Sequence, residues 1–240
     1  MNKIESINIS YWYKELDNNP INKVMELQNN LKSIFDADFM INDTPALQKI
    51  SMPRIQGISN DKKYFFSMSL VNANLVININ GEKDSDEVLL LINNYLQLVY
   101  DVLKEIYDLE ILYSSIKIEL TCEDNKEEVL KKLNILDENI EDFSVKKGLK
   151  KDNYYINYTI SNSKEYNFNI NKENIYQEDL YDRTMLISLK DAILNREYIV
   201  TNIEINDRLS YNIDPKYLSN KDSLRGMIFE LREIIKENNI

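Results

Sequence analysis

The stretch that decides the fold covers residues 84–106 and reads DSDEVLLLINNYLQLVYDVLKEI. Asp84 and Glu87 stand at capping-box spacing, in which the Asp carboxylate accepts from first-turn amides while the Glu side chain reaches back to the cap. Behind them apolar residues recur at helical spacing: Val88, Ile92, Tyr95, Val99, Val102 and Ile106. We therefore expect a long amphipathic helix over 85–107.

The carboxylates at the start of this helix have a second interpretation. Asp84, Asp86 and Glu87 could hold a divalent cation, since hard ions prefer clustered oxygens. No Gly-containing calcium loop surrounds them, and capping explains the same residues with fewer assumptions. The acidic residues over 123–128 also suit the first turn of a helix, where the dipole favours negative charge. We expect no metal and no cofactor.

Strand patterns flank the long helix on both sides. Asn19 and Pro20 form a helix start, with apolar residues at helical spacing as far as Phe35. Alternation of apolar and polar residues predicts strands in four places: 7–13, 64–70, 75–79 and 116–122. Residues 1–123 thus have the order β-α-β-β-α-β, which is typical of a ferredoxin-like sandwich with helices on one sheet face.

The pattern restarts at Asp124. We expect a short helix over 124–133 and short strands over 143–147, 154–160 and 166–170, with turns at Gly148 and Asn162-Ser163. Residues 184–194 fit either period; their spacing favours a helix, while Met185-Leu186-Ile187 favours a strand, and we predict a helix. A hairpin that turns at Asn206-Asp207 and a helix after Asp222 complete the module. We predict an α+β fold of two packed α/β modules. The first, 1–123, is the β-α-β-β-α-β sandwich; the second, 124–240, is a mainly antiparallel sheet with a C-terminal helix, packed with the first as one unit.

The composition excludes several classes of enzyme. The 240 residues include no His and one Cys, so an imidazole base, a Cys/His dyad and a multi-Cys zinc site cannot be built. The four Gly cannot be arranged as G-x-G-x-x-G or as a Walker loop. Cys122 falls on the apolar side of a predicted strand, where it is expected to act as a small buried hydrophobe. We expect a protein that is not an enzyme.

Net charge and the start of the chain bear on partners and location. The chain has 40 acidic and 29 basic side chains and a net charge of −11. This excess disfavours non-specific DNA binding and attracts basic surfaces, although it also serves solubility. The start lacks the pattern of a signal peptide, and no apolar run is long enough for a membrane span. We expect a cytoplasmic protein that does not bind membranes.

Aromatic residues are the first candidates for partner contact. The chain has 16 Tyr and a single Trp. Such rings provide large contact areas at a low entropic cost, and they also pack in cores. We expect Trp12, Tyr154 and Tyr155 to contact a protein partner.

Four lysines around Gly148 are the second set of candidates. Lys146, Lys147, Lys150 and Lys151 precede a group of tyrosines. Lysines that follow a phosphate backbone, beside rings that stack on bases, are typical of single-stranded RNA contacts. A solvated hairpin turn explains the same residues. The alternative prediction is an RNA-binding accessory protein that uses these four lysines.

Several local strings resemble those of a bacterial protein family of about this size. The family is sporadically distributed, has no assigned function and is often encoded near defence or mobile genes. The similar strings are Met52–Ile55, Ser59–Lys62, Leu75–Asn78, Tyr211–Asp214 and Ile228-Phe229. The resemblance implies no catalytic residues, so none is transferred.

These observations together predict a function. We expect an acidic, non-enzymatic protein-binding module, an accessory or inhibitor of nucleic-acid-handling machinery in a phage or bacterial defence setting, similar to an anti-CRISPR protein. Its partner would be a protein with a basic surface, such as a nucleic-acid-binding effector, and direct contact with nucleic acid is not expected. The sequence does not decide whether the protein forms a homodimer.

Overall fold

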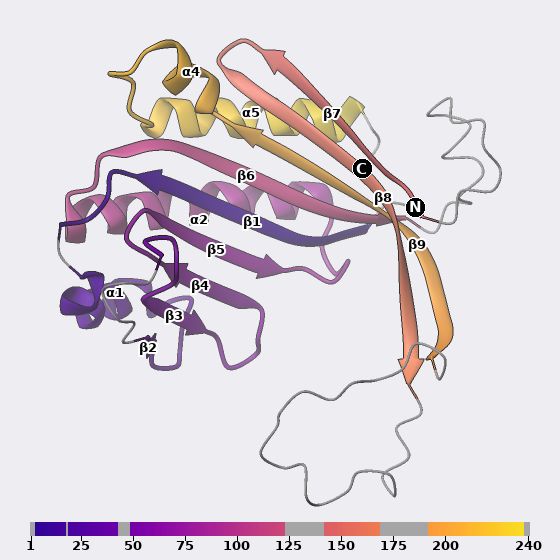
Figure 1. Ribbon diagram of the computed structural model, residues 1–240, viewed down its shortest axis with the longest axis horizontal. Helices are drawn as coiled ribbons and strands as arrows, with labels where there is room; N and C mark the ends of the chain where they lie inside the picture. The colour runs from indigo at the N-terminus through magenta and orange to yellow at the C-terminus, as the bar shows by residue number, and fades with distance from the viewer. Residues whose placement is uncertain (1–2, 18, 43–48, 123–141, 169–191, 238–240) are drawn as a thin grey trace, which may run out of the picture.

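The computed structural model describes residues 3–17, 19–42, 49–122, 142–168 and 192–237 (Figure 1). In chain order the elements are β1 (Lys3–Tyr13), η1 (Pro20–Lys23), α1 (Val24–Leu31), β2 (Met40–Ile41), β3 (Ile55–Ile58), β4 (Tyr64–Met68), β5 (Asn72–Asn78), α2 (Ser85–Tyr107), β6 (Ile111–Cys122), β7 (Ser144–Lys151), β8 (Tyr154–Phe168), β9 (Ala192–Asn206), α4 (Arg208–Ile213) and α5 (Lys221–Glu237). The mixed α+β class is confirmed.

The strands form one antiparallel sheet of nine in the order β2-β3-β4-β5-β1-β6-β9-β8-β7. β1 pairs with β5 on one side and β6 on the other, and β6 continues the sheet by pairing with β9. α2 and α5 lie together on one face of this sheet, so its other face is turned away from both long helices (Figure 1). Residues from both predicted modules therefore contribute to a single sheet.

The core lies between the sheet and the helices. Ile7 and Ile9 of β1 and Val88 and Ile92 of α2 are fully buried there. Several tyrosine hydroxyls bond to backbone within this layer: Tyr11 donates to Leu96 O, Tyr13 to Ser69 O and Tyr107 to Pro20 O. These three tyrosines are therefore structural, since each has a buried or half-buried ring whose hydroxyl finds a backbone acceptor.

The capping-box prediction is confirmed. Asp84 accepts a hydrogen bond from Glu87 N at 2.9 Å, and the Glu87 carboxylate accepts one from Asp84 N at 3.3 Å. The acidic cluster at the start of α2 thus satisfies the backbone of its own helix. None of the helices in the described part of the chain is long and apolar enough to cross a membrane.

Two predicted turns are wrong. Gly148 lies inside β7 opposite Asn157, and the chain turns instead at Asp152, whose φ is 50°. β8 runs through Asn162 with only a register shift after Glu165. The lysines on both faces of β7 hide its alternation, which is why Gly148 resembles a turn signal.

The predicted last hairpin is also wrong. β9 ends at Asn206 as expected, but α4 replaces the second strand. Ser210 N donates to Asp207 O, and Ile213, expected on a buried strand face, is 72% exposed. The predicted helix over 124–133 lies outside the described residues, as do residues 184–191 of the predicted helix over 184–194. The last three residues of that helix, 192–194, form the start of β9, so the helix prediction is wrong there.

Candidate binding site on the open face of the sheet

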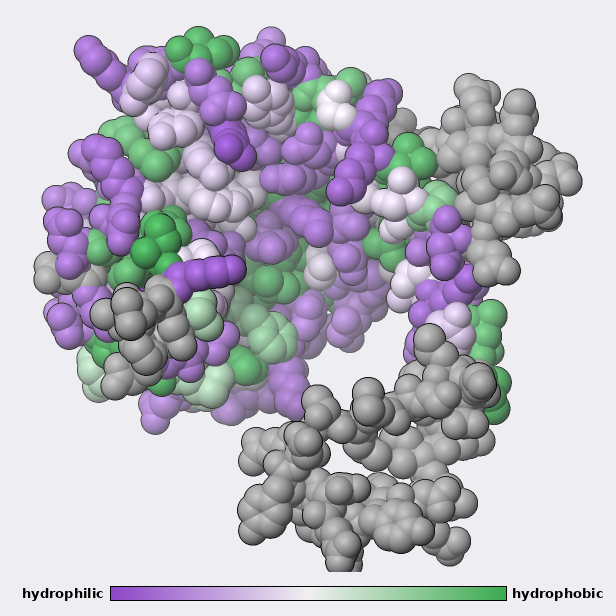
Figure 2. All heavy atoms as spheres, viewed as in Figure 1, coloured by the Kyte–Doolittle hydropathy of each residue, from purple (hydrophilic) through white to green (hydrophobic). Residues whose placement is uncertain are grey.

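The face turned away from α2 and α5, here called the open face, is lined by polar residues. One row that crosses the sheet through paired positions consists of Ser67, Asn74, Ser10, Ser115, Asn206 and Tyr155. The space-filling view from this side shows a mainly hydrophilic surface (Figure 2). This polar row runs from β4 to β8, and a sheet face with such a row is suited to contact with water or a polar partner.

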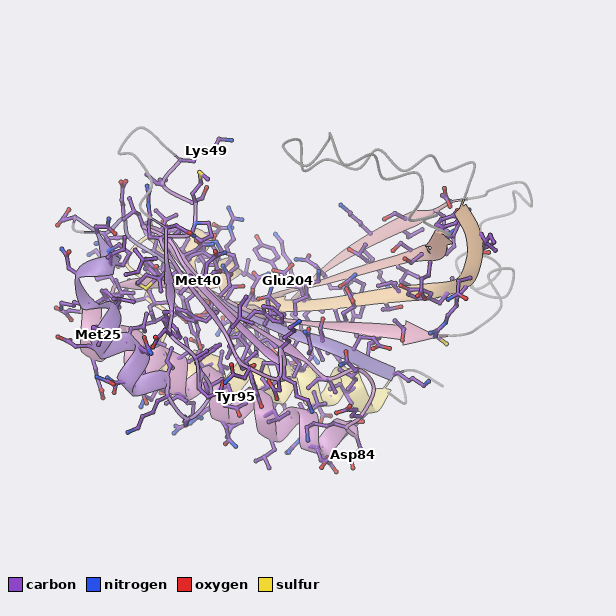
Figure 3. All side chains as sticks on the ribbon, turned by 90° about the horizontal axis from the view of Figure 1, so that it is seen from below. Met25, Met40, Lys49, Asp84, Tyr95 and Glu204 are labelled. Atoms are coloured by element: carbon purple, nitrogen blue, oxygen red, sulfur yellow. The ribbon has the colours of Figure 1, made fainter. Side chains whose placement is uncertain are left out.

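A cavity of about 370 Å³ opens on this face where β1, β6, β8 and β9 meet α4. We call it the open-face cavity. Its lining includes Trp12, Tyr113, Tyr155, Glu204, Asn206 and Arg208. Figure 3 shows Glu204 on the opposite side of the sheet from Asp84 and Tyr95 of α2.

Aromatic rings form one wall of the cavity. Trp12 stacks on Tyr113 with 4.7 Å between ring centroids and 17° between ring planes, because β1 and β6 place the two residues opposite each other. The ring centroid of Tyr211 in α4 lies 5.9 Å from that of Tyr113. The Arg208 guanidinium lies 5.3 Å from the Tyr113 centroid, at cation–π distance.

Glu204 carries the negative charge of the cavity. Its carboxylate accepts hydrogen bonds from Asn206 Nδ2 at 3.2 Å and from Asn157 Nδ2 at 3.3 Å. Asn206 is only 6% exposed, and its Oδ1 accepts no hydrogen bond from any described residue. A buried acceptor without a donor is costly, so Asn206 destabilises this part of the sheet slightly and is fixed mainly by its bond to Glu204.

A buried network on the helix side holds α4 in position. Asp207 is fully buried; its Oδ1 accepts from Ser114 N at 2.6 Å, and its Oδ2 accepts from Ser219 Oγ at 2.6 Å and Tyr217 OH at 2.8 Å. Burial raises the pKa of Asp207, while these donors oppose the rise. Arg208 is the next residue after Asp207, so the network also fixes the position from which the Arg208 guanidinium reaches the open face.

Of the three predicted contact aromatics, Trp12 and Tyr155 both line the open-face cavity. Tyr154 points to the other face, is 9% exposed and donates to Ser223 O of α5 at 3.1 Å. Alternation along β8 separates the two neighbouring tyrosines in this way. Whether any of them contacts a partner stays a prediction.

The four predicted lysines are divided between the faces of β7. Lys146 and Lys150 belong to the open face, in register with Thr159 and Tyr155, and Lys150 Nζ lies 5.7 Å from the Tyr155 ring centroid. Lys147 and Lys151 belong to the helix face. Lys151 forms an ion pair at 2.7 Å with Glu230 of α5, whose side chain is 9% exposed.

Tyr113, Glu204, Asn206 and Arg208 were not among the predicted contact residues. Period-two alternation in β6 and β9 assigns Tyr113, Glu204 and Asn206 to one face of their strands. The sequence does not reveal, however, that β9 pairs with β6 rather than with a later strand. Arg208 was assigned to a hairpin. These residues could be found only once the register was known.

A second exposed surface lies on the helix side. Leu90 of α2 and Phe229 of α5 are each 61% exposed and line a groove of about 480 Å³ between the two helices, with Arg225 and Arg232. Among the described residues, no three His, Cys, Asp or Glu side chains are grouped closely enough to hold a metal.

No protein-family model matches the chain, and no curated protein matches it.

Proposed function

We propose that this protein is a non-enzymatic binding module and that the open face of its sheet is the recognition surface. The observation that carries the proposal is the stack of Trp12 on Tyr113, with Arg208 over the second ring, on a polar sheet face. Trp, Tyr and Arg are the residue types that contribute most to binding at protein interfaces. The lack of His and of phosphate-binding loops in the sequence supports a role without catalysis.

The partner that we propose is a protein with a basic surface that belongs to nucleic-acid-handling machinery. The protein would act as an accessory or inhibitor in a phage or bacterial defence setting, in the manner of an anti-CRISPR protein. The net charge of −11 over the whole chain supports long-range attraction of such a partner, although Arg208 and Lys150 on the open face themselves are cations, and the family resemblance supports the setting.

A second candidate function is RNA binding. It is favoured by one observation, the placement of Lys146 and Lys150 on the same face as Tyr155 and Trp12. In this version the open face, rather than a turn with four lysines, would hold a single strand.

We also propose that residues 1–123 form a ferredoxin-like module, which the strand order β4-β5-β1-β6 supports.

A tagged pull-down from source-cell or phage-host lysate, with and without nuclease, tests the module and separates its two partner classes. Trp12→Ala and Tyr113→Ala should each reduce recovery of the partner at least about tenfold. Phe229→Ala, a change at an exposed aromatic on the helix side, is the matched control and should leave recovery unchanged.

The outcomes are distinct. A protein that survives nuclease and is lost with the open-face variants supports the first proposal, and RNA retained only by the native protein supports the second. A partner that binds the native and open-face variants equally would overturn the assignment of the open face. For the first proposal, recovery that does not change with ionic strength would overturn the electrostatic contribution.

A further inference from the structure

We infer that the open-face cavity binds a guanine base, a flat ring with two adjacent N–H groups on one edge. This goes beyond the proposed function, because it concerns the chemistry of one ligand group and holds for a free nucleotide without any protein partner. The inference rests on three features of the cavity: unused acceptors, an aromatic wall and cations at its rim.

The acceptors determine which edge of a ligand fits. An ionised carboxylate offers about four acceptor positions. Among the described residues, Asn206 donates to one oxygen of the Glu204 carboxylate and Asn157 to the other, so each oxygen retains capacity for a ligand donor. A ligand with two parallel N–H groups matches this carboxylate, and guanine presents such a pair through N1–H and its exocyclic amine.

The rings determine the shape of the ligand. Trp12, Tyr113 and Tyr155 all line the cavity, and the first two are nearly parallel. Stacking of a base on such rings stabilises binding by about 1–3 kcal/mol per base. The cavity volume of about 370 Å³ lies in the range of small-molecule sites.

The cations favour guanine over the other common group with two parallel N–H donors, an arginine side chain. Arg208 lines the cavity and Lys150 lies beside Tyr155. Among the described residues Arg208 forms no ion pair, so its guanidinium can receive a phosphate. An incoming arginine would face repulsion from both groups, whereas a nucleotide offers its base to Glu204 and its phosphate to the cations.

The single tryptophan makes the test direct. Trp12 is the only Trp in the chain and lines the cavity, so intrinsic fluorescence reports on its occupancy. GMP should change the emission of the native protein saturably, and AMP should bind at least about tenfold more weakly because it lacks the N1–H donor. Calorimetry with the same nucleotides checks that the change is binding and not absorption by the purine.

Variants assign the recognition to particular residues. Glu204→Gln should remove most of the preference for GMP over AMP. Arg208→Ala should weaken binding of both nucleotides and leave that preference unchanged. Phe229→Ala should bind as the native protein does. The thermal unfolding midpoint of each variant shows whether it is folded, and the native GMP-to-AMP ratio remains decisive if a variant does not fold.

Two further ligands distinguish the sources of the base. Binding of a short single-stranded RNA with one guanine is compared with binding of a strand that has only adenine, which shows whether the cavity accepts a base that belongs to a strand. Tight binding of the guanine strand together with weak binding of GMP assigns the cavity to nucleic acid. If N-acetyl-arginine amide binds and GMP does not, or if no ligand binds, the inference is overturned. Either result leaves the proposed protein interface untouched, because a protein interface requires no nucleotide, whereas failure of the RNA to bind would count against the second candidate function.

Discussion

The hydroxyl of Tyr154 occupies the space that a side chain at residue 226 would need. A Cβ built on Gly226 would lie 2.0 Å from Tyr154 Oη, and the hydroxyl itself donates to Ser223 O at 3.1 Å. Gly226 sits in the middle of α5, where glycine normally weakens a helix. The missing side chain lets β8 approach the helix closely enough for this hydrogen bond.

Gly226→Ala should therefore destabilise the protein. In an ordinary helix the change would stabilise by about 1 kcal/mol, but here the methyl overlaps with Tyr154, and we expect a loss of about 1–3 kcal/mol. Tyr154→Phe should partly relieve this loss in the double variant, because the nearest remaining atom, Cζ, is 3.0 Å from the added Cβ. Urea unfolding of the four proteins measures the coupling. A Gly226→Ala variant as stable as the native protein would contradict the close approach.

The ion pair between Lys151 and Glu230 gives a second prediction. Lys151→Ala leaves the Glu230 carboxylate without its cation in a largely buried position. We expect the free energy of unfolding to fall by about 1–3 kcal/mol. Lys147→Ala is the matched control, since Lys147 is exposed on the same strand and face, and should change stability by less than about 0.5 kcal/mol. Equal effects of the two changes would mean that the ion pair contributes nothing.

The capping box of α2 gives a third prediction. Asp84→Ala removes the acceptor for Glu87 N and should cost about 1 kcal/mol, while Asp84→Asn keeps an acceptor and should cost less. Thermal unfolding with and without a chelator checks the alternative that these carboxylates hold a cation. A lower melting temperature after chelation in the native protein, but not in Asp84→Ala, would favour the cation.

Asp207 gives a prediction about pH. Burial raises its pKa above the ordinary value of 3.8, so the folded state binds this proton more tightly than the unfolded state. The stabilisation from this group is fully present below pH 3.8 and is lost as the pH rises through the raised pKa. The native protein should thus lose stability relative to Asp207→Asn as the pH increases across this window. Denaturant unfolding of both proteins over a pH series measures the difference, and a difference that moves the other way would mean that the hydrogen bonds outweigh burial.

The sequence predicts the long helix and four of the strands of the N-terminal half, because each is specified locally, but it predicts neither of the short strands β2 and β3. The capping residues and apolar stripe of 84–106 predict α2 to within a residue of its bounds. Alternation likewise identifies β1, β4, β5 and β6. Where both faces of a strand carry polar residues, as at Lys146 to Lys151, no alternation exists to be detected, and Gly148 is mistaken for a turn.

The candidate site is less accessible to sequence analysis, because it depends on register between distant strands. Trp12 and Tyr113 meet only because β1 and β6 are paired at that position, and Glu204 joins them only because β9 follows β6 in the sheet. The sequence singles out Trp12 and Tyr155 by residue type. It does not distinguish Tyr155 from Tyr154, whose opposite orientations follow from the exact start of β8.

The central position of β1 has a consequence for how the chain acquires its structure during synthesis. This first strand lies between β5 and β6, and its partner Tyr113 is translated about a hundred residues after Trp12. β6 in turn lacks its pairing partner β9 until residues 192–206 have been synthesised. Until those segments leave the ribosome, the nascent chain presents unpaired strand edges that favour association with other chains. Such long-range pairing predicts slow folding for a chain of this length and a need for chaperones before the last third is complete.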